Sequence, residues 1–128
     1  MAGTITISVS KVNQNLERIR FTCVGDASDG SFPETQTGFT VQGKVLMGLS
    51  NPGAPAPTAD YDISINDEAG CDIMGGEMTD RSQTVSEQVM PLIGSGYDKR
   101  PVNDKLTIAI TGNAVNSAEV VVDLFVEK

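Results

Sequence analysis

Acidic side chains gather in three short polar segments of the sequence, and clustered carboxylates are the groups that bind Ca²⁺. The segments are residues 26–29, 60–62 and 67–72, in which Asp67 and Glu68 are the best candidates for an ion site. None of the segments follows the D-x-[DN]-x-[DN]-G order of a calcium-binding loop. Aspartate side chains also close turns by accepting hydrogen bonds from nearby backbone. We therefore expect turn-forming carboxylates, with an ion site as the alternative.

Catalytic chemistry has few residue types to draw on in this chain. The 128 residues include no histidine, which excludes Ser-His and Cys-His nucleophile pairs and histidine-based zinc sites. Two carboxylates could hydrolyse a glycosidic bond, but there is no tryptophan to hold a sugar. Tyr61 and Tyr97 are the only tyrosines, and Tyr61 is expected to anchor the core with its hydroxyl at an edge. We predict that the chain is not an enzyme and has no catalytic residue, cofactor or metal, with carbohydrate binding as an alternative function.

The two cysteines do not form a disulfide framework. Cys23 and Cys71 stand alone, without a C-x-x-C motif, and two thiols cannot hold a structural zinc ion by themselves. We expect two reduced, partly buried thiols and therefore folding in the cytoplasm. A Cys23–Cys71 bridge, which suits an oxidising compartment, is the alternative.

The charge balance bears on the partners. Nine lysines and arginines against seventeen aspartates and glutamates give a net charge of −8, which argues against binding to nucleic acid or to an anionic membrane. No apolar run approaches the roughly 18 residues of a membrane span, and we expect no signal peptide. The cations Lys11, Arg18, Arg20, Lys99 and Arg100 either form a solvated surface or dock onto acidic patches of another subunit.

The elements that would position these residues are strands. Thirteen valines, nine isoleucines and eleven threonines against six leucines give a β-branched excess, and 13 glycines and six prolines supply turns. Apolar and polar residues alternate with the period of two that is typical of a half-buried strand. The sequence predicts an all-β fold with one domain over residues 1–128. We expect an antiparallel β-sandwich or small barrel of about seven to nine short strands.

Individual segments give more specific expectations. Predicted strands cover residues 4–9, 17–24, 39–42, 44–50, 60–65, 71–74, 105–111 and 118–126, with a short helix as the alternative for residues 44–50. The first two form a hairpin that would bring Lys11, Arg18 and Arg20 together on an exposed face. A second hairpin turns at residues 66–70, where Gly70 supplies a positive φ. The last strand is apolar on both faces, so we expect it to be central or buried, with Val121 and Phe125 in need of cover.

Three segments are expected to lie outside the central strands. Residues 51–59 are proline-rich and cannot occupy a central strand, because proline has no backbone donor. Residues 93–104 are expected to form a loop. Within residues 78–92, Thr84 and Glu87 have the spacing of a capping box, so residues 85–90 form either one helical turn or an extended edge segment.

One long segment carries a family resemblance. The stretch NPGAPAPTADYDISINDEAGCDIMGG, residues 51–76, resembles a recurrent segment of small structural proteins encoded beside the capsid and tail genes of tailed bacteriophages. The stretch RPVNDKLTIAITGNA and the final VVVDLFVEK are similar to later strands of the same group. The resemblance covers about residues 40–128. The two cysteines and the methionine-rich CDIMGGEM depart from the pattern, and no functional residue is carried over.

This resemblance implies a virion component that folds in the cytoplasm of the host bacterium. The leading expectation is a capsid decoration or minor head protein that acts through adhesion between subunits. Its partners would be copies of itself in a homo-oligomer, for which a trimer is one option, and the major capsid protein or other virion subunits. A tail or baseplate protein and a carbohydrate-binding attachment module are the alternatives.

Overall fold

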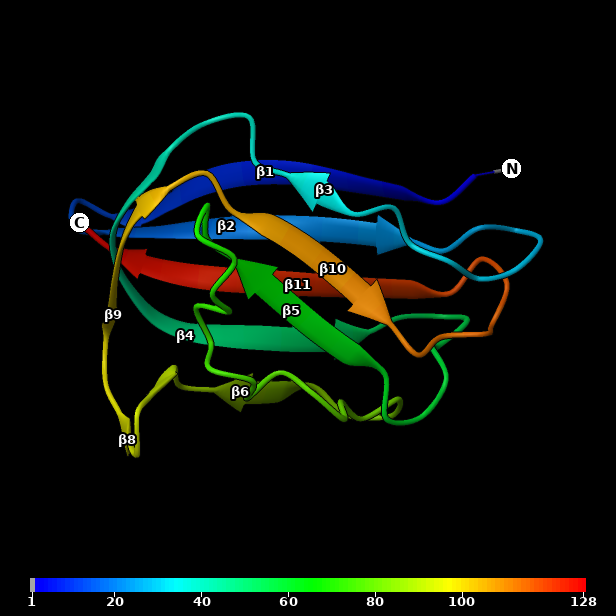
Figure 1. Ribbon diagram of the computed structural model, residues 1–128. Coiled ribbons are helices and arrows are strands. Elements are labelled where there is room, and N and C mark those ends of the chain that lie inside the picture. Colours follow the sequence, from blue (N-terminus) through cyan, green and yellow to red (C-terminus); the bar gives the residue numbers. More distant parts are fainter. Residues whose placement is uncertain (1) are drawn as a thin grey trace.

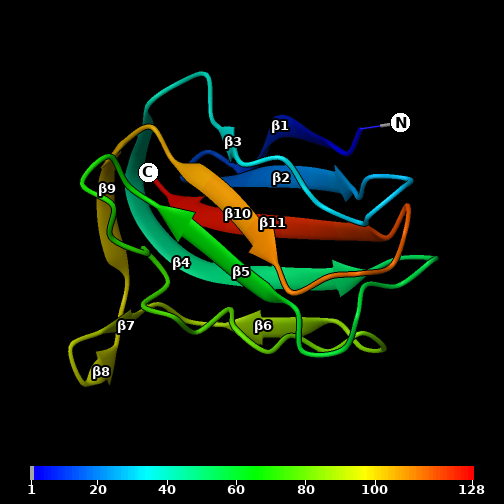
Figure 2. The ribbon, with the colours of Figure 1, turned by 45° about the vertical axis from the view of Figure 1, so that its right-hand side comes forward.

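The computed structural model describes residues 2–128, and these form two main antiparallel sheets, a small two-stranded sheet and no helix (Figures 1 and 2). The first sheet has the order β1 (Thr4–Asn13), β2 (Leu16–Val24), β11 (Glu119–Glu127), β4 (Val41–Pro52) and β6 (Glu87–Val89), and β9 (Arg100–Asp104) also pairs with β4. The second sheet has the order β3 (Thr35–Gln36), β10 (Thr107–Thr111) and β5 (Asp62–Asn66), and β7 (Leu92–Ile93) pairs with β8 (Gly96–Tyr97). The predicted all-β, antiparallel class is confirmed. The strands that exceed the expected number are short ones of two or three residues.

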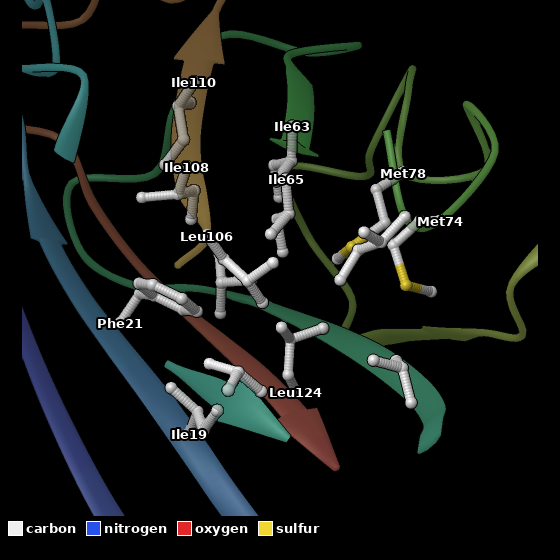
Figure 3. Close-up of a cluster of buried hydrophobic side chains, with 14 of the residues drawn as sticks. Ile19, Phe21, Ile63, Ile65, Met74, Met78, Leu106, Ile108, Ile110 and Leu124 are labelled. Atoms are coloured by element: carbon white, nitrogen blue, oxygen red, sulfur yellow. The ribbon is translucent and has the colours of Figure 1, made fainter. Parts of the chain in front are cut away.

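The core lies between the two sheets, because β5 and β10 cross one face of β11 and β4 (Figures 1 and 2). Alternate residues of each strand point inward, and their side chains meet in the middle of the molecule (Figure 3). The labelled set is Ile19, Phe21, Ile63, Ile65, Met74, Met78, Leu106, Ile108, Ile110 and Leu124, all at most 5% exposed. Burying side chains of this size contributes about 1.5–3 kcal/mol each, which holds the two sheets together.

The β1–β2 hairpin is present as predicted, but its register corrects one expectation. Asn13 accepts a hydrogen bond on Oδ1 from the backbone N–H of Asn15 at 2.8 Å, which closes the turn. Lys11 lies opposite Glu17, whereas Arg18 and Arg20 lie opposite Ser10 and Ser8. Opposed residues share a face and successive residues alternate. Lys11 is therefore on the other face of the sheet from the two arginines.

Strand β4 is longer than predicted. The segments 39–42 and 44–50 were expected as separate strands, but one strand runs from Val41 to Pro52, and Phe39 precedes it. Gly43 continues the strand with a φ of 136°, a conformation that side-chain-bearing residues rarely adopt. Pro52 ends the strand opposite Val120 of β11. The expectation that residues 51–59 lie outside the central strands is therefore wrong for residues 51 and 52, because a proline is tolerated at the strand end, where the hydrogen-bond ladder stops.

The predicted loop at residues 93–104 is also wrong. Arg100–Asp104 forms β9, which pairs with Val41–Val45 of β4. Pro101 lacks a donor, but β9 pairs with β4 alone, and an edge strand tolerates proline. In the segment 78–92 the extended alternative is the correct one, since Glu87–Val89 pairs with β4. The carboxylate of Glu87 accepts from the backbone N–H of Ser82 at 2.7 Å, so the expected capping residue closes a turn.

The second predicted hairpin is half confirmed. Its turn is present, with Gly70 at a φ of 86°, but the strand expected at residues 71–74 is reduced to one bridge between Asn66 and Asp72. The Asp72 carboxylate accepts from the backbone N–H groups of Met74 at 3.1 Å and Gly76 at 3.0 Å, which curls the chain away from the sheet.

Strands β10 and β11 form where expected, and β11 is central between β2 and β4. Residues 2–128 contain no helix long and apolar enough to cross a membrane.

Candidate functional site

The face of the first sheet that points away from the second sheet is the main candidate for a functional surface, and we call it the open face. It is built from three neighbouring strands, β2, β11 and β4, whose opposed residues form rows across the sheet. The strands of the second sheet leave it uncovered (Figures 1 and 2). Its members are Arg18, Arg20 and Thr22 of β2, Val121, Asp123 and Phe125 of β11, and Met47, Leu49 and Asn51 of β4.

A buried ion pair occupies the centre of the open face. Arg20 donates two hydrogen bonds to Asp123, from Nε to Oδ1 at 2.9 Å and from Nη2 to Oδ2 at 3.0 Å. The Asp123 side chain is only 2% exposed, while that of Arg20 is 39% exposed and covers it. The hydrogen bonds to Asp123 and the charge of its carboxylate raise the pKa of Arg20. The centre of the face is therefore electrically neutral and already hydrogen-bonded.

Apolar side chains surround this ion pair. Val121 and Phe125 flank Asp123 along β11, and Met47 and Leu49 lie beside them on β4. All four are half-buried by their neighbours, without a layer above them. The sequence correctly placed Val121 and Phe125 on one face of a central strand, and the second sheet leaves that face uncovered. It did not indicate that Asp123 is buried, because the residue that covers it, Arg20, lies 103 positions away.

The cations predicted as a solvated surface or a docking site lie in three places: Lys11 is exposed near the end of β1, Arg18 and Arg20 are on the open face, and Lys99 and Arg100 form ion pairs elsewhere. Lys99 pairs with Glu127 of β11, and Arg100 of β9 pairs with Asp67 in the turn at residues 66–70, each at 2.9 Å. These two ion pairs connect the β8–β9 segment to β11 and to that turn. Arg18 lies opposite Phe125 on the open face, and its Nε is buried without a hydrogen-bond partner among residues 2–128. Arg18 therefore adds an unused donor to the rim of this face.

The acidic clusters are engaged in local structure. Asp67 accepts on Oδ1 from the backbone N–H groups of Ala69 at 3.0 Å and Cys71 at 2.9 Å, and the N–H of Cys71 together with Arg100 holds the pKa of Asp67 below its ordinary value. Glu68 accepts from the backbone N–H of Lys105 at 2.9 Å. Other aspartates accept backbone N–H groups in the same way: Asp26, Asp29, Asp62 and Asp72. No group of three or more potential ligands able to hold a metal occurs in the described part of the chain.

Gly70→Val should destabilise the protein by about 1–3 kcal/mol, because valine is strained at a φ of 86°. Apart from Gly70 and its two chain neighbours, no heavy atom of residues 2–128 lies within 4 Å of the position a Cβ would take, so the cost is conformational. Gly70→Asn is the matched control and should cost clearly less, since asparagine tolerates this region. Urea unfolding measures both. EDTA should leave the melting temperature of the unmodified protein unchanged. A drop of several degrees that calcium restores would instead establish an ion site at this turn.

The two cysteines are free, and their environments differ. Cys23 points into the core from β2, and burial raises the pKa of its thiol to about 12. Cys71 is exposed at the end of the turn, so the expectation that both are partly buried is corrected. Iodoacetamide at a pH of about 8 should therefore label Cys71 and spare Cys23 in the native protein. Mass spectrometry without reductant should show one label before unfolding and two after it, and a Cys23–Cys71 disulfide would contradict this prediction.

The tyrosines also lie in different places. Tyr61 is fully buried, hydroxyl included, so its expected position with the hydroxyl at an edge is wrong. Tyr97 is 58% exposed and donates a hydrogen bond to Glu77. With Gln88, Val89 and Met90 these two residues line a groove of about 320 Å³ beside β6. This groove combines an aromatic ring with polar groups, as a small polar ligand requires.

Comparisons with known proteins add little to this description. No protein-family model matches the chain, and no curated protein matches it. Among solved structures, the chain is similar to a cupin domain from Bordetella pertussis Tohama I, with a TM-score of 0.36 and 13% sequence identity. The match covers 100% of this chain and 97% of that domain. A likeness this distant does not bear on function.

Proposed function

We propose that this chain is an adhesive structural subunit of a tailed-bacteriophage virion, of the capsid decoration or minor head protein kind. The observation that carries the proposal is the open face, where half-buried apolar side chains surround a neutralised ion pair on an uncovered sheet. The sequence resemblance of residues 51–76 to phage structural proteins supports the same class. The major capsid protein or another virion subunit is the proposed partner.

The open face suits adhesion for a physical reason. Covering Val121, Phe125, Met47 and Leu49 removes apolar surface from water, at about 25 cal/mol per Å². The Asp123 carboxylate adds little to the cost of covering this face, because it has already lost its contact with water and is paired with Arg20. The Arg20 side chain is 39% exposed, so the partner has to accept hydrogen bonds from its remaining N–H groups. A subunit that binds across the seam between two capsid subunits adds contacts that must break before the seam opens. The bound particle is stabilised by that binding free energy.

Antibody labelling of virions in negative-stain images tests the location. Labelled heads support decoration of the capsid, and labelled tails support the alternative of a tail or baseplate subunit. Virions without label anywhere would contradict both. For the surface, Phe125→Glu should weaken binding to capsids or tails prepared without this protein by about tenfold or more. Val85→Glu is the matched control, because Val85 is 57% exposed and lies outside the open face.

Carbohydrate binding is a second candidate, favoured by the exposed ring of Tyr97 in the groove beside β6. Glu77 and Gln88 could accept and donate hydrogen bonds to sugar hydroxyls there. A glycan array with the unmodified chain and with Tyr97→Ala decides this point. Binding that the substitution abolishes would support an attachment module, and an array without signal would contradict it.

A further inference from the structure

The outer edge of β1 is a long strand edge without a partner. β1 spans ten residues at the end of the first sheet and pairs with β2 alone (Figures 1 and 2). Within residues 2–128, no backbone hydrogen bond outside this hairpin involves Thr4 to Asn13. Thr4, Thr6, Ser8 and Ser10 are all exposed. Half of the N–H and C=O groups of β1 are therefore free to pair with another strand.

This edge lacks the features that keep strand edges apart. Natural edge strands are usually short, or they carry proline or charged side chains, which block pairing with other molecules. The opposite edge of the same sheet, β6, has three residues, includes Glu87 and is followed closely by Pro91. By contrast, residues 4–10 of β1 contain neither proline nor charge. The first irregularity comes at Lys11–Asn13, beyond that segment.

The segment is also complementary to itself. Residues 4–10 read Thr-Ile-Thr-Ile-Ser-Val-Ser, which alternates hydroxyl and aliphatic side chains symmetrically about Ile7. Two copies paired antiparallel about Ile7 would place aliphatic side chains opposite one another on one face and hydroxyls on the other. The opposed pairs would be Ile7 with Ile7, Ile5 with Val9, Thr6 with Ser8 and Thr4 with Ser10 of the second copy.

Packing and charge favour a second copy as the occupant. Ile5 and Ile7 pack against the core, but Val9 of the same face is 44% exposed and would be covered by Ile5 of the second copy. The absence of charge in residues 4–10 lets two molecules of net charge −8 meet without opposing like charges at the contact. A proline-free, uncharged and self-complementary edge fits another copy of itself on all three counts.

We propose that two copies of this chain pair through β1 about a two-fold axis at Ile7, which joins their first sheets into one continuous sheet. The proposal does not depend on the proposed function, because the dimer forms in solution without a capsid or tail. A single strand pair buries less area than a standard protein interface, so we expect a dissociation constant on the order of 10 µM.

Charge pairs introduced at Thr6 and Ser8 test both the interface and its register. These residues are exposed, and each would lie opposite the other residue of the second copy. In T6K/S8K, each introduced lysine faces an introduced lysine, so the dissociation constant should rise by about tenfold or more. In T6K/S8E and in T6E/S8K, opposite charges face each other, and the constant should stay within about threefold of the original. Sedimentation equilibrium from about 1 to 100 µM measures these constants.

The design separates the proposed contact from simpler explanations. T6K/S8K reduces the magnitude of the net charge from −8, which weakens general repulsion, yet it is expected to dissociate the dimer. Thermal melts show whether each variant is folded. An unmodified protein that stays monomeric over this range, or a dimer that T6K/S8K leaves intact, would overturn the proposal. Dissociation of T6K/S8E would overturn the register, because pairing centred on residue 6 or 8 would oppose like charges in that variant.

Discussion

Gly75→Ala is expected to destabilise the protein by about 3 kcal/mol or more, through positive-φ strain and a steric clash. Gly75 has a φ of 66°, and an added Cβ would clash with the carbonyl oxygen of Leu92. The neighbouring backbone cannot move freely, because Met74 is fully buried and its carbonyl oxygen accepts from the N–H of Leu92 at 3.2 Å. The clash therefore displaces either a core side chain or the start of β7.

Gly76→Ala is the matched control for this prediction. Gly76 is the next residue, with a similar φ of 82°, but beyond its two chain neighbours no heavy atom in the described part of the chain lies within 4 Å of the position of its added Cβ. It should cost only the roughly 1–2 kcal/mol of the left-handed conformation. Urea unfolding of the two variants side by side isolates the contribution of the clash. Equal losses of stability would show that the approach of Leu92 to Gly75 does not constrain this turn.

Arg20→Met is expected to lower the melting temperature by on the order of 10 °C, because it leaves the carboxylate of Asp123 buried without its partner. Asp123→Leu should be milder, within about 3 °C, although it breaks the same ion pair. The difference follows from exposure: Asp123 is 2% exposed and cannot reach water, whereas Arg20 is 39% exposed and can. The loss of stability therefore depends on whether the charged residue left behind can reach water.

The double variant R20M/D123L completes this test. Replacing a whole buried ion pair with apolar side chains is often neutral, so the double variant should melt close to Asp123→Leu and well above Arg20→Met. Differential scanning calorimetry at one pH and protein concentration measures all three. Equal losses for the two single substitutions would show that Asp123 reaches solvent, and would remove the argument that the centre of the open face is easy to cover.

Elements with alternating apolar residues could be predicted from the sequence, because alternation reports directly which face of a strand is buried. This holds for β2, where Ile19, Phe21 and Cys23 point inward, and for β11, whose two apolar faces gave it a central place. Turns with an obligatory residue were predictable for a local reason as well. Gly70 ends its turn with a positive φ, as the sequence NDEAG indicated.

The remaining parts of the fold depend on partners that local sequence does not reveal. The sequence favoured a loop over residues 93–104, yet β9 forms there because it pairs with the edge of β4 along Val41–Val45. The same holds for the candidate site, since the burial of Asp123 depends on Arg20, which only the pairing of β11 with β2 brings close. The strands and turns were thus open to prediction, whereas the ion pair of the open face was not.

The position of β11 has a consequence for how this protein is made. Among the strands described for residues 2–128, β11 is synthesised after the others, yet it lies between β2 and β4, two of the earlier ones. Until it arrives, the nascent chain holds two unsatisfied strand edges and lacks the four core residues that β11 supplies, Val120, Val122, Leu124 and Val126. Pairings between residues so far apart in sequence form slowly, and such intermediates aggregate readily. The nascent chain should therefore be prone to aggregation until residues 119–127 insert between β2 and β4.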